Sequence, residues 1–193
     1  ADLKEALANL KRIVFCERGE AFIVAGAGTL SMEMALVNTA ASGDRVLVLS
    51  QGYFGDRMAA VGRAFGLNVD LIQSPWGKVV PPSDLAAALG KADYKIVAAT
   101  HVDTATGSCA PVEAYAAAAR RAGALTIVDG VCATGGVAER MDDWGIDVVL
   151  TAAQKCFGAP PGLAILVLSE RAMDKRRGLP SVPAYYADVL RWL

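Results

Sequence analysis

The chain has 193 residues, of which 54% are hydrophobic and 20% are charged, and its net charge is −1. This composition is typical of a folded globular protein and excludes a disordered chain. The near-neutral charge gives no electrostatic attraction to nucleic acid or to an anionic membrane, and no apolar run approaches the ~20 residues of a membrane-spanning helix.

Apolar runs and helical patterns alternate along the chain. We predict a helix at 1–15, a strand at 21–26, a helix at 29–40, a strand at 45–50, a helix at 54–66 and a strand at 68–74. There follow a helix at 81–92 with Ser83 or Asp84 as its N-cap, a strand at 94–101, a helix at 111–123, strands at 124–130, 146–152 and 163–169, and a helical pattern at 184–193. Strands without polar alternation predict an α/β fold, with a mostly parallel mixed sheet sandwiched by helices.

Both ends of the sequence lie inside helical patterns, and the first residue is Ala1 rather than methionine. We therefore interpret the chain as one piece of a longer protein. Any activity would then depend partly on segments outside these residues.

The cysteines and the single histidine limit the possible chemistry. Four cysteines, at 16, 109, 132 and 156, show no paired spacing, and no signal peptide begins the chain. They predict reduced thiols in a cytoplasmic protein. One histidine, His101, argues against a histidine-rich metal site, and we predict no metal. We expect His101 to pack and hydrogen-bond rather than to act as a general base.

Small, polar and aromatic residues follow several of the predicted strands. In such sheets, ligands bind in the crevice beyond the carboxyl ends of the strands. The residues found there are the stretches 26–29, 51–54 and 102–107, which include Ala27, Gly28, Thr29, Phe54, Asp103 and Thr104, and then Asp129, Gln154 and Lys155. They are the groups that we expect to converge.

The stretch from Gly26 to Thr29 joins a strand to a helix. Its small residues and the first N–H groups of the helix favour an anion such as phosphate, although a tight turn that only packs strand on helix would look the same. A dinucleotide-binding G-x-G-x-x-G motif is disfavoured because Ser31 takes the third glycine position. No acidic residue ends the strand at 45–50, which weakens a nicotinamide-dependent oxidoreductase further.

Two titratable residues complete the pattern. Asp129 ends an apolar strand and needs a cationic or hydrogen-bonding partner, although an ordinary strand-end aspartate that caps a turn also fits. Lys155, if desolvated or flanked by cations, would form imines with carbonyl groups, and otherwise it extends its amine to solvent. A phosphate cradle, a carboxylate and an amine match the phosphate, the ring nitrogen and the aldehyde of pyridoxal 5'-phosphate, and Phe54 would stack on its ring.

Six stretches carry a resemblance to a known family. They are GAGTLSMEMAL, GDRVLVLSQGYFGDR, HVDTATG, IVDGVCATGG, MDDWGIDVVLTAAQKCFGAPPGLAILVLSERA and PSVPAYYADVLRWL. They cover residues 20–193 in family order, and the chain resembles the class V aminotransferases, particularly the alanine–glyoxylate and serine–pyruvate enzymes. The resemblance implies the large domain of the fold type I pyridoxal-phosphate transferases at 1–178, with 179–193 leading toward a small C-terminal domain.

The resemblance also implies roles for individual residues. Lys155 would hold the cofactor as a Schiff base and shuttle a proton at the substrate's α carbon, and Asp129 would pair with the ring nitrogen. The other implied cofactor-binding residues are Ala27, Gly28, Thr29, Phe54, Thr104, Val131 and Gln154. Relatives commonly have Ser-Gly-His where this chain has Ala27-Gly28-Thr29, which removes one side-chain donor and changes another.

The function implied by the resemblance is transfer of an amino group from alanine or serine to glyoxylate or pyruvate. The family further implies a homodimer with its active site at the subunit interface. The alternatives are another pyridoxal-phosphate reaction, as in a lyase or desulfurase, or a catalytically incomplete fragment. A desulfurase needs a nucleophilic cysteine on a flexible loop, and neither Cys132 nor Cys156 occupies one.

Overall fold

The computed structural model describes residues 3–193 and contains a sheet of seven strands. The strands are β1 (Glu20–Ala25), β2 (Arg45–Ser50), β3 (Asn68–Gln73), β4 (Ile96–Thr100), β5 (Leu125–Asp129), β6 (Val148–Ala152) and β7 (Leu163–Leu168). Each corresponds to a predicted apolar run, with ends that differ by a few residues. The strand predictions are therefore confirmed.

Helices connect and cover these strands. They are α1 (Leu3–Ile13), α2 (Gly28–Val37), α3 (Tyr53–Ala64), α4 (Pro82–Leu89), α5 (Val112–Arg121), α6 (Met141–Trp144) and α7 (Glu170–Gly178), with a short 3-10 helix, η1 (Val189–Arg191). Across residues 3–193, no helix has both the length and the apolar character needed to cross a bilayer.

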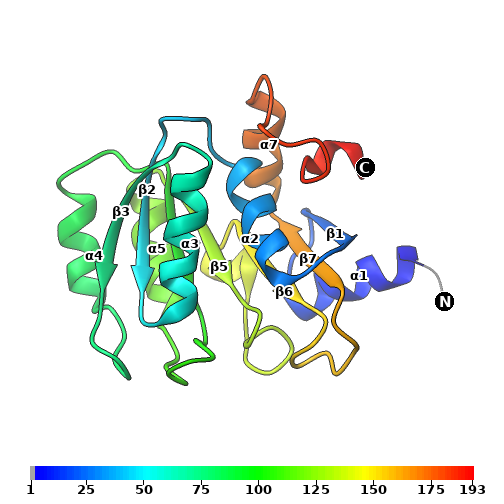
Figure 1. Ribbon diagram of the computed structural model, residues 1–193, viewed down its shortest axis with the longest axis horizontal. Helices are drawn as coiled ribbons and strands as arrows, with labels where there is room; N and C mark the ends of the chain where they lie inside the picture. Colours follow the sequence, from blue (N-terminus) through cyan, green and yellow to red (C-terminus); the bar gives the residue numbers. More distant parts are fainter. Residues whose placement is uncertain (1–2) are drawn as a thin grey trace.

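The strand order is β1-β7-β6-β5-β4-β2-β3 (Figure 1). Neighbours from β3 to β6 are parallel, whereas β7 runs antiparallel to both β6 and β1. Because β1 is antiparallel to β7, it runs in the same direction as β6. The carboxyl ends of six strands therefore meet at one edge of the sheet, as the mostly parallel mixed sheet requires.

Two hydrophobic cores lie on opposite faces of the sheet. In β6, Val148 and Leu150 pack into the core formed with α2, α3 and α7. The intervening Val149 packs into the second core with residues of α1, α4, α5 and α6. This alternation explains why the central strands are continuously apolar, and it confirms a sheet covered by helices on both sides (Figure 1).

Two predictions about helices are wrong. The N-cap of α4 is Pro81 rather than Ser83 or Asp84, because the chain enters the helix with Pro82 in its first turn. The pattern at 184–193 forms only η1, since contacts with distant residues fix this segment.

Those contacts join the C-terminal segment to two helices. Arg176 donates to Asp188 at 2.9 Å, and the Asp188 side chain in turn accepts from Leu190 N. Asn38, which follows α2, donates to Ala187 O at 2.7 Å and accepts from Val189 N at 3.0 Å. The segment is therefore held against α2 and α7.

Candidate functional site

A cavity of about 240 Å³ opens at the carboxyl edge of the sheet. All nine predicted site residues line it: Ala27, Gly28, Thr29, Phe54, Thr104, Asp129, Val131, Gln154 and Lys155. Asp129 is the last residue of β5, and the others lie within a few residues after the ends of β1, β2, β4, β5 and β6. The sheet thus brings together groups that lie up to 128 positions apart in the sequence, from Ala27 to Lys155.

Asp129 is the buried acid of this cavity, with 2% of its surface exposed. The register of β4 with β5 places it opposite Thr100, whose hydroxyl lies 3.5 Å from Oδ2. Val131 N donates to Oδ1 at 3.0 Å. Burial raises the pKa of Asp129 to about 6, and among residues 3–193 it takes part in no ion pair with a cationic side chain.

The first turn of α2 forms another wall. Ala27 is its N-cap residue and makes no side-chain cap, so the first N–H groups of the helix are available to a ligand. Gly28 lets this turn approach the opposite wall. A Cβ at Gly28 would lie only 3.2 Å from Val131 Cγ2 and 3.5 Å from Ala152 Cβ.

Phe54 is half-buried at the start of α3, and a buried aspartate holds it there. The carboxylate of Asp103 accepts from Phe54 N at 3.1 Å, and from Ala105 N and Thr106 N at 2.8 and 3.2 Å. From the sequence, Asp103 is one of the strand-end residues expected to converge, but no role is predicted for it. Its signal was the D-T-A-T-G stretch, in which an aspartate commonly accepts from its own following turn.

Arg57 is a residue of the site that sequence reasoning missed. Its guanidinium donates to Thr29 Oγ1 at 3.1 Å and to the Tyr53 hydroxyl at 2.9 Å. It also lies over the Phe54 ring, 5.3 Å from the centroid. No ion pair joins Arg57 to a carboxylate within the described part of the chain, so its positive charge is available at the α2 end of the cavity.

Lys155 and Gln154 lie at the mouth of the cavity, and both are exposed. The lysine is therefore not desolvated by this chain alone, contrary to one of the settings considered from the sequence. Its loop is tied back to the sheet, because Gly26 N donates to Gly162 O at 2.8 Å. Thr104 lies on the opposite rim, with Oγ1 2.7 Å from the thiol of Cys132.

His101 does not line this cavity. It is buried, and its Nδ1 lies 2.9 Å from Glu139 Oε1, which confirms the expected packing and hydrogen-bonding role.

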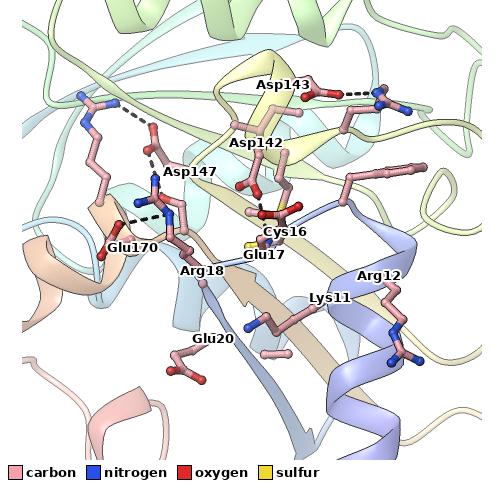
Figure 2. A pocket seen from close by; sticks show the side chains of 18 of the residues that line it. Lys11, Arg12, Cys16, Glu17, Arg18, Glu20, Asp142, Asp143, Asp147 and Glu170 are labelled. Atoms are coloured by element: carbon pink, nitrogen blue, oxygen red, sulfur yellow. Dashed lines mark hydrogen bonds and ion pairs between the residues drawn. The ribbon is translucent and has the colours of Figure 1, made fainter.

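A much larger cleft, of about 1390 Å³, lies at the opposite edge of the sheet (Figure 2). It is lined by α1, by residues 15–21 and by residues before β6 and after β7. Four of its acidic side chains are already partnered: Asp143 pairs with Arg140, Asp147 with Arg171 and Glu170 with Arg18, while Asp142 accepts from Glu17 N (Figure 2). Glu17 and Glu20 also line the cleft, and both are exposed to water. The cleft is larger, but its buried acid, Asp147, already has a cationic partner.

The smaller cavity therefore combines three chemical features. It offers a buried carboxylate that needs a cation, a helix N-terminus with an arginine that suits an anion, and a primary amine at the mouth. A ligand that carries a basic nitrogen, an anionic group and an amine-reactive carbonyl would satisfy all three.

Comparisons with known proteins point the same way. A sequence model of the family Aminotransferase class-V matches residues 2–181. The chain is 38% identical over 176 residues to the soluble hydrogenase small subunit of Synechococcus sp., covering 89% of this chain and 46% of that protein. It is 37% identical over 181 residues to the L-aspartate–glyoxylate aminotransferase of Paracoccus denitrificans, and this match covers 89% of this chain and 45% of that protein.

The fold is also that of solved aminotransferases. The crystal structure of an alanine–glyoxylate aminotransferase from Nostoc sp. has a TM-score of 0.94 to this chain at 32% identity, and the match covers 98% of this chain and 51% of that one. The chain thus spans about half the length of the relatives it matches.

Proposed function

Because the chain belongs to the class V aminotransferase family, we propose that it forms the cofactor-binding part of a pyridoxal-phosphate-dependent aminotransferase. The reaction would move an amino group from a small amino acid, alanine or serine, to glyoxylate or pyruvate. Glyoxylate is supported by the names of the Paracoccus and Nostoc relatives. The observation that carries the proposal is the convergence of nine predicted residues on one cavity, around a buried and unpaired Asp129.

The residues present fit pyridoxal phosphate. Asp129 would accept from its protonated ring nitrogen, which supplies the cation that the buried carboxylate lacks. The first turn of α2 and the guanidinium of Arg57 would bind its phosphate. Phe54 and Val131 would pack on the two faces of its ring.

The remaining residues would hold the reactive end. When bound, the cofactor supplies an aldehyde that bonds to amines and a ring that withdraws electrons from the substrate's α carbon. Lys155 would bind the aldehyde through Nζ and, once displaced by the substrate, move a proton to and from the α carbon. Thr104 and Gln154 would orient the cofactor by hydrogen bonds from opposite rims of the cavity.

We further propose that the complete enzyme is a cytoplasmic homodimer with its active site at the interface. Exposure of Ala27, Thr104, Gln154 and Lys155 at the cavity mouth supports this assembly, because a second subunit would shield them from water. Four free cysteines agree with a reducing compartment. Residues 1–178 would form the large domain, with 179–193 leading toward a small one.

Borohydride reduction tests the lysine and the cofactor together. The protein is mixed with pyridoxal phosphate, its visible absorbance is recorded, and the adduct is fixed with borohydride and located by mass spectrometry. We expect one covalent adduct on Lys155, which Lys155→Ala abolishes and the exposed-lysine control Lys91→Ala retains. No adduct in the unmodified protein, or an adduct that persists in Lys155→Ala, would contradict the proposed function.

A further inference from the structure

A buried polar cluster lies behind the proposed cofactor cavity. The side chains of Glu139 and His101 are 0% and 6% exposed, and Oε1 of the glutamate lies 2.9 Å from Nδ1 of the histidine. Thr134 Oγ1 donates to the other oxygen, Oε2, at 2.6 Å. None of these three residues lines the cavity, and the proposed chemistry uses none of them.

The cluster packs against the backbone that carries Asp129. His101 N donates to Asp129 O at 2.9 Å. The next residue is Gly130, where a Cβ would lie 2.7 and 2.8 Å from the two carboxylate oxygens of Glu139. Glycine therefore allows the Glu139 carboxylate to sit directly against the chain, one residue beyond Asp129.

A second buried carboxylate at this place has an electrostatic consequence. Burial, with smaller contributions from the charges of Glu139 and Asp103, raises the pKa of Asp129 to about 6, while hydrogen bonds from Val131 N and Thr100 oppose the rise. Like charges in a region of low dielectric disfavour each other's ionised form. An uncompensated Glu139 would thus work against the negative charge that Asp129 needs.

We infer that His101 is a positioning residue of this site: as a cation bonded to Glu139, it neutralises that carboxylate and keeps Asp129 ionised for a cationic ring. The inference rests on the proposed function for the identity of that ring. His101 also lines an open depression together with Pro111, Glu113 and Trp144.

Two substitutions separate this role from a purely structural one. His101→Asn removes the cation and leaves Glu139 charged, so the pKa of Asp129 should rise by about one unit. Glu139→Gln removes the anion, so the pKa of Asp129 should fall by a similar amount. The double variant should return close to the original value. Loosening of the fold would instead move both single variants in the same direction.

The measurement is a carbon-13 NMR titration of the Asp129 carboxyl in the cofactor-free protein. Glu170→Gln, at an exposed position of α7, is the charge control and should not shift this pKa. At pH 6 we also expect pyridoxal phosphate affinity to fall about fivefold in His101→Asn and to recover in the double variant. Nitrogen-15 NMR of the unmodified protein provides a second test, because it reports whether both ring nitrogens of His101 carry protons at pH 6.

A neutral His101 ring at pH 6, absent shifts, or shifts of the same sign would overturn the inference. If pyridoxal phosphate binds normally in those cases, the proposed function stands without it. Opposite shifts in a protein that never binds pyridoxal phosphate would refute the proposed function and, with it, the role of His101 at a cofactor.

Discussion

The two hollows of this molecule, at opposite edges of one sheet, differ in size and in how their charges are arranged. The larger, of about 1390 Å³, contains one buried acid, Asp147, which already meets Arg171, and its other acidic residues are exposed. The smaller, of about 240 Å³, contains a buried carboxylate without a cation and an arginine without a carboxylate.

The smaller hollow is thus distinguished by a buried, unpaired charge and not by its volume. Asp129 and Asp147 make the point directly, since each is only 2% exposed. Asp147 accepts from Arg171, Thr126 N and Ser169, at 3.0, 2.9 and 3.2 Å. Asp129 has one backbone donor and one distant hydroxyl. A buried acid left in this state suggests a ligand that completes it.

The largest expected effect comes from exchanging these two aspartates for asparagine. Asp129→Asn should weaken pyridoxal phosphate binding about 100-fold, because a broken buried ion pair costs about 3 kcal/mol. Asp147→Asn should leave that affinity unchanged while it lowers the free energy of unfolding, since it disrupts the contact with Arg171. Fluorescence titration with pyridoxal phosphate and urea denaturation measure the two effects. Equal losses of pyridoxal phosphate affinity in both variants would contradict the prediction that only the smaller hollow binds it.

Asparagine at position 129 should weaken cofactor binding, but it should stabilise the cofactor-free protein. Its pKa is raised from 3.8 to about 6, so the folded state binds the proton more tightly than the unfolded state. This tighter binding stabilises the folded state fully below about pH 4, and the stabilisation is lost as the pH rises through about 6. The loss in the free energy of unfolding is about 3 kcal/mol.

Asp129→Asn lacks this titration and should therefore be more stable than the unmodified protein at pH 7, by up to about 3 kcal/mol. The difference should close by pH 4. Denaturation curves at several pH values measure it. A variant that is less stable at pH 7 would show that Asp129 is already compensated without a cofactor.

A smaller effect is expected for the arginines. Arg57→Gln removes the positive charge beside the first turn of α2 and should weaken pyridoxal phosphate binding about tenfold, as expected for one charge-assisted hydrogen bond. Arg12→Gln, in the larger cleft, is the matched control and should have no effect. Binding of pyridoxal, which lacks the phosphate, should be insensitive to both changes. A loss for pyridoxal in Arg57→Gln would place the arginine at another part of the cofactor.

The smallest effect is expected for an exposed pair in the larger cleft. Nε of Arg140 lies 2.6 Å from Oδ2 of Asp143, but both side chains are exposed. Arg140→Gln should change the free energy of unfolding by no more than about 0.5 kcal/mol, because water screens such pairs. Urea denaturation tests this. A loss comparable to that of Asp147→Asn would mean that the cleft depends on its surface charges.

The sequence predicted the sheet well because its central strands are buried on both faces. Short runs such as Val148–Ala152 are apolar at nearly every side chain, so they show neither a helical nor an alternating pattern and are typical of strands buried on both faces. Helix α7 was missed because it is highly charged, with an apolar pattern too weak to stand out. The pattern at 184–193 failed for a different reason: Asp188 contacts Arg176, and this distant partner fixes a non-helical path.

The site was predictable where a residue lies at the carboxyl end of a strand or a few residues beyond it. Asp129 and Lys155 occupy such positions, and the family resemblance added the roles. Arg57 was not predictable in this way, because its contact with Thr29 depends on how α2 and α3 pack side by side. Glu139 is similar, since its partner His101 comes from another loop and Gly130 lies nine residues earlier in its own.

The reversed direction of β7 affects the entropy of the lysine loop. Residues 153–162 connect two adjacent antiparallel strands, so both ends of the loop that carries Lys155 are anchored to the same edge of the sheet. A short loop anchored at both ends has few accessible conformations. Much of its conformational entropy is therefore lost when the protein folds, and less remains to be lost when a ligand binds. Lengthening the loop by a few glycines would test this. Lys155 should still bond to the aldehyde of pyridoxal phosphate, but the bond should form more slowly.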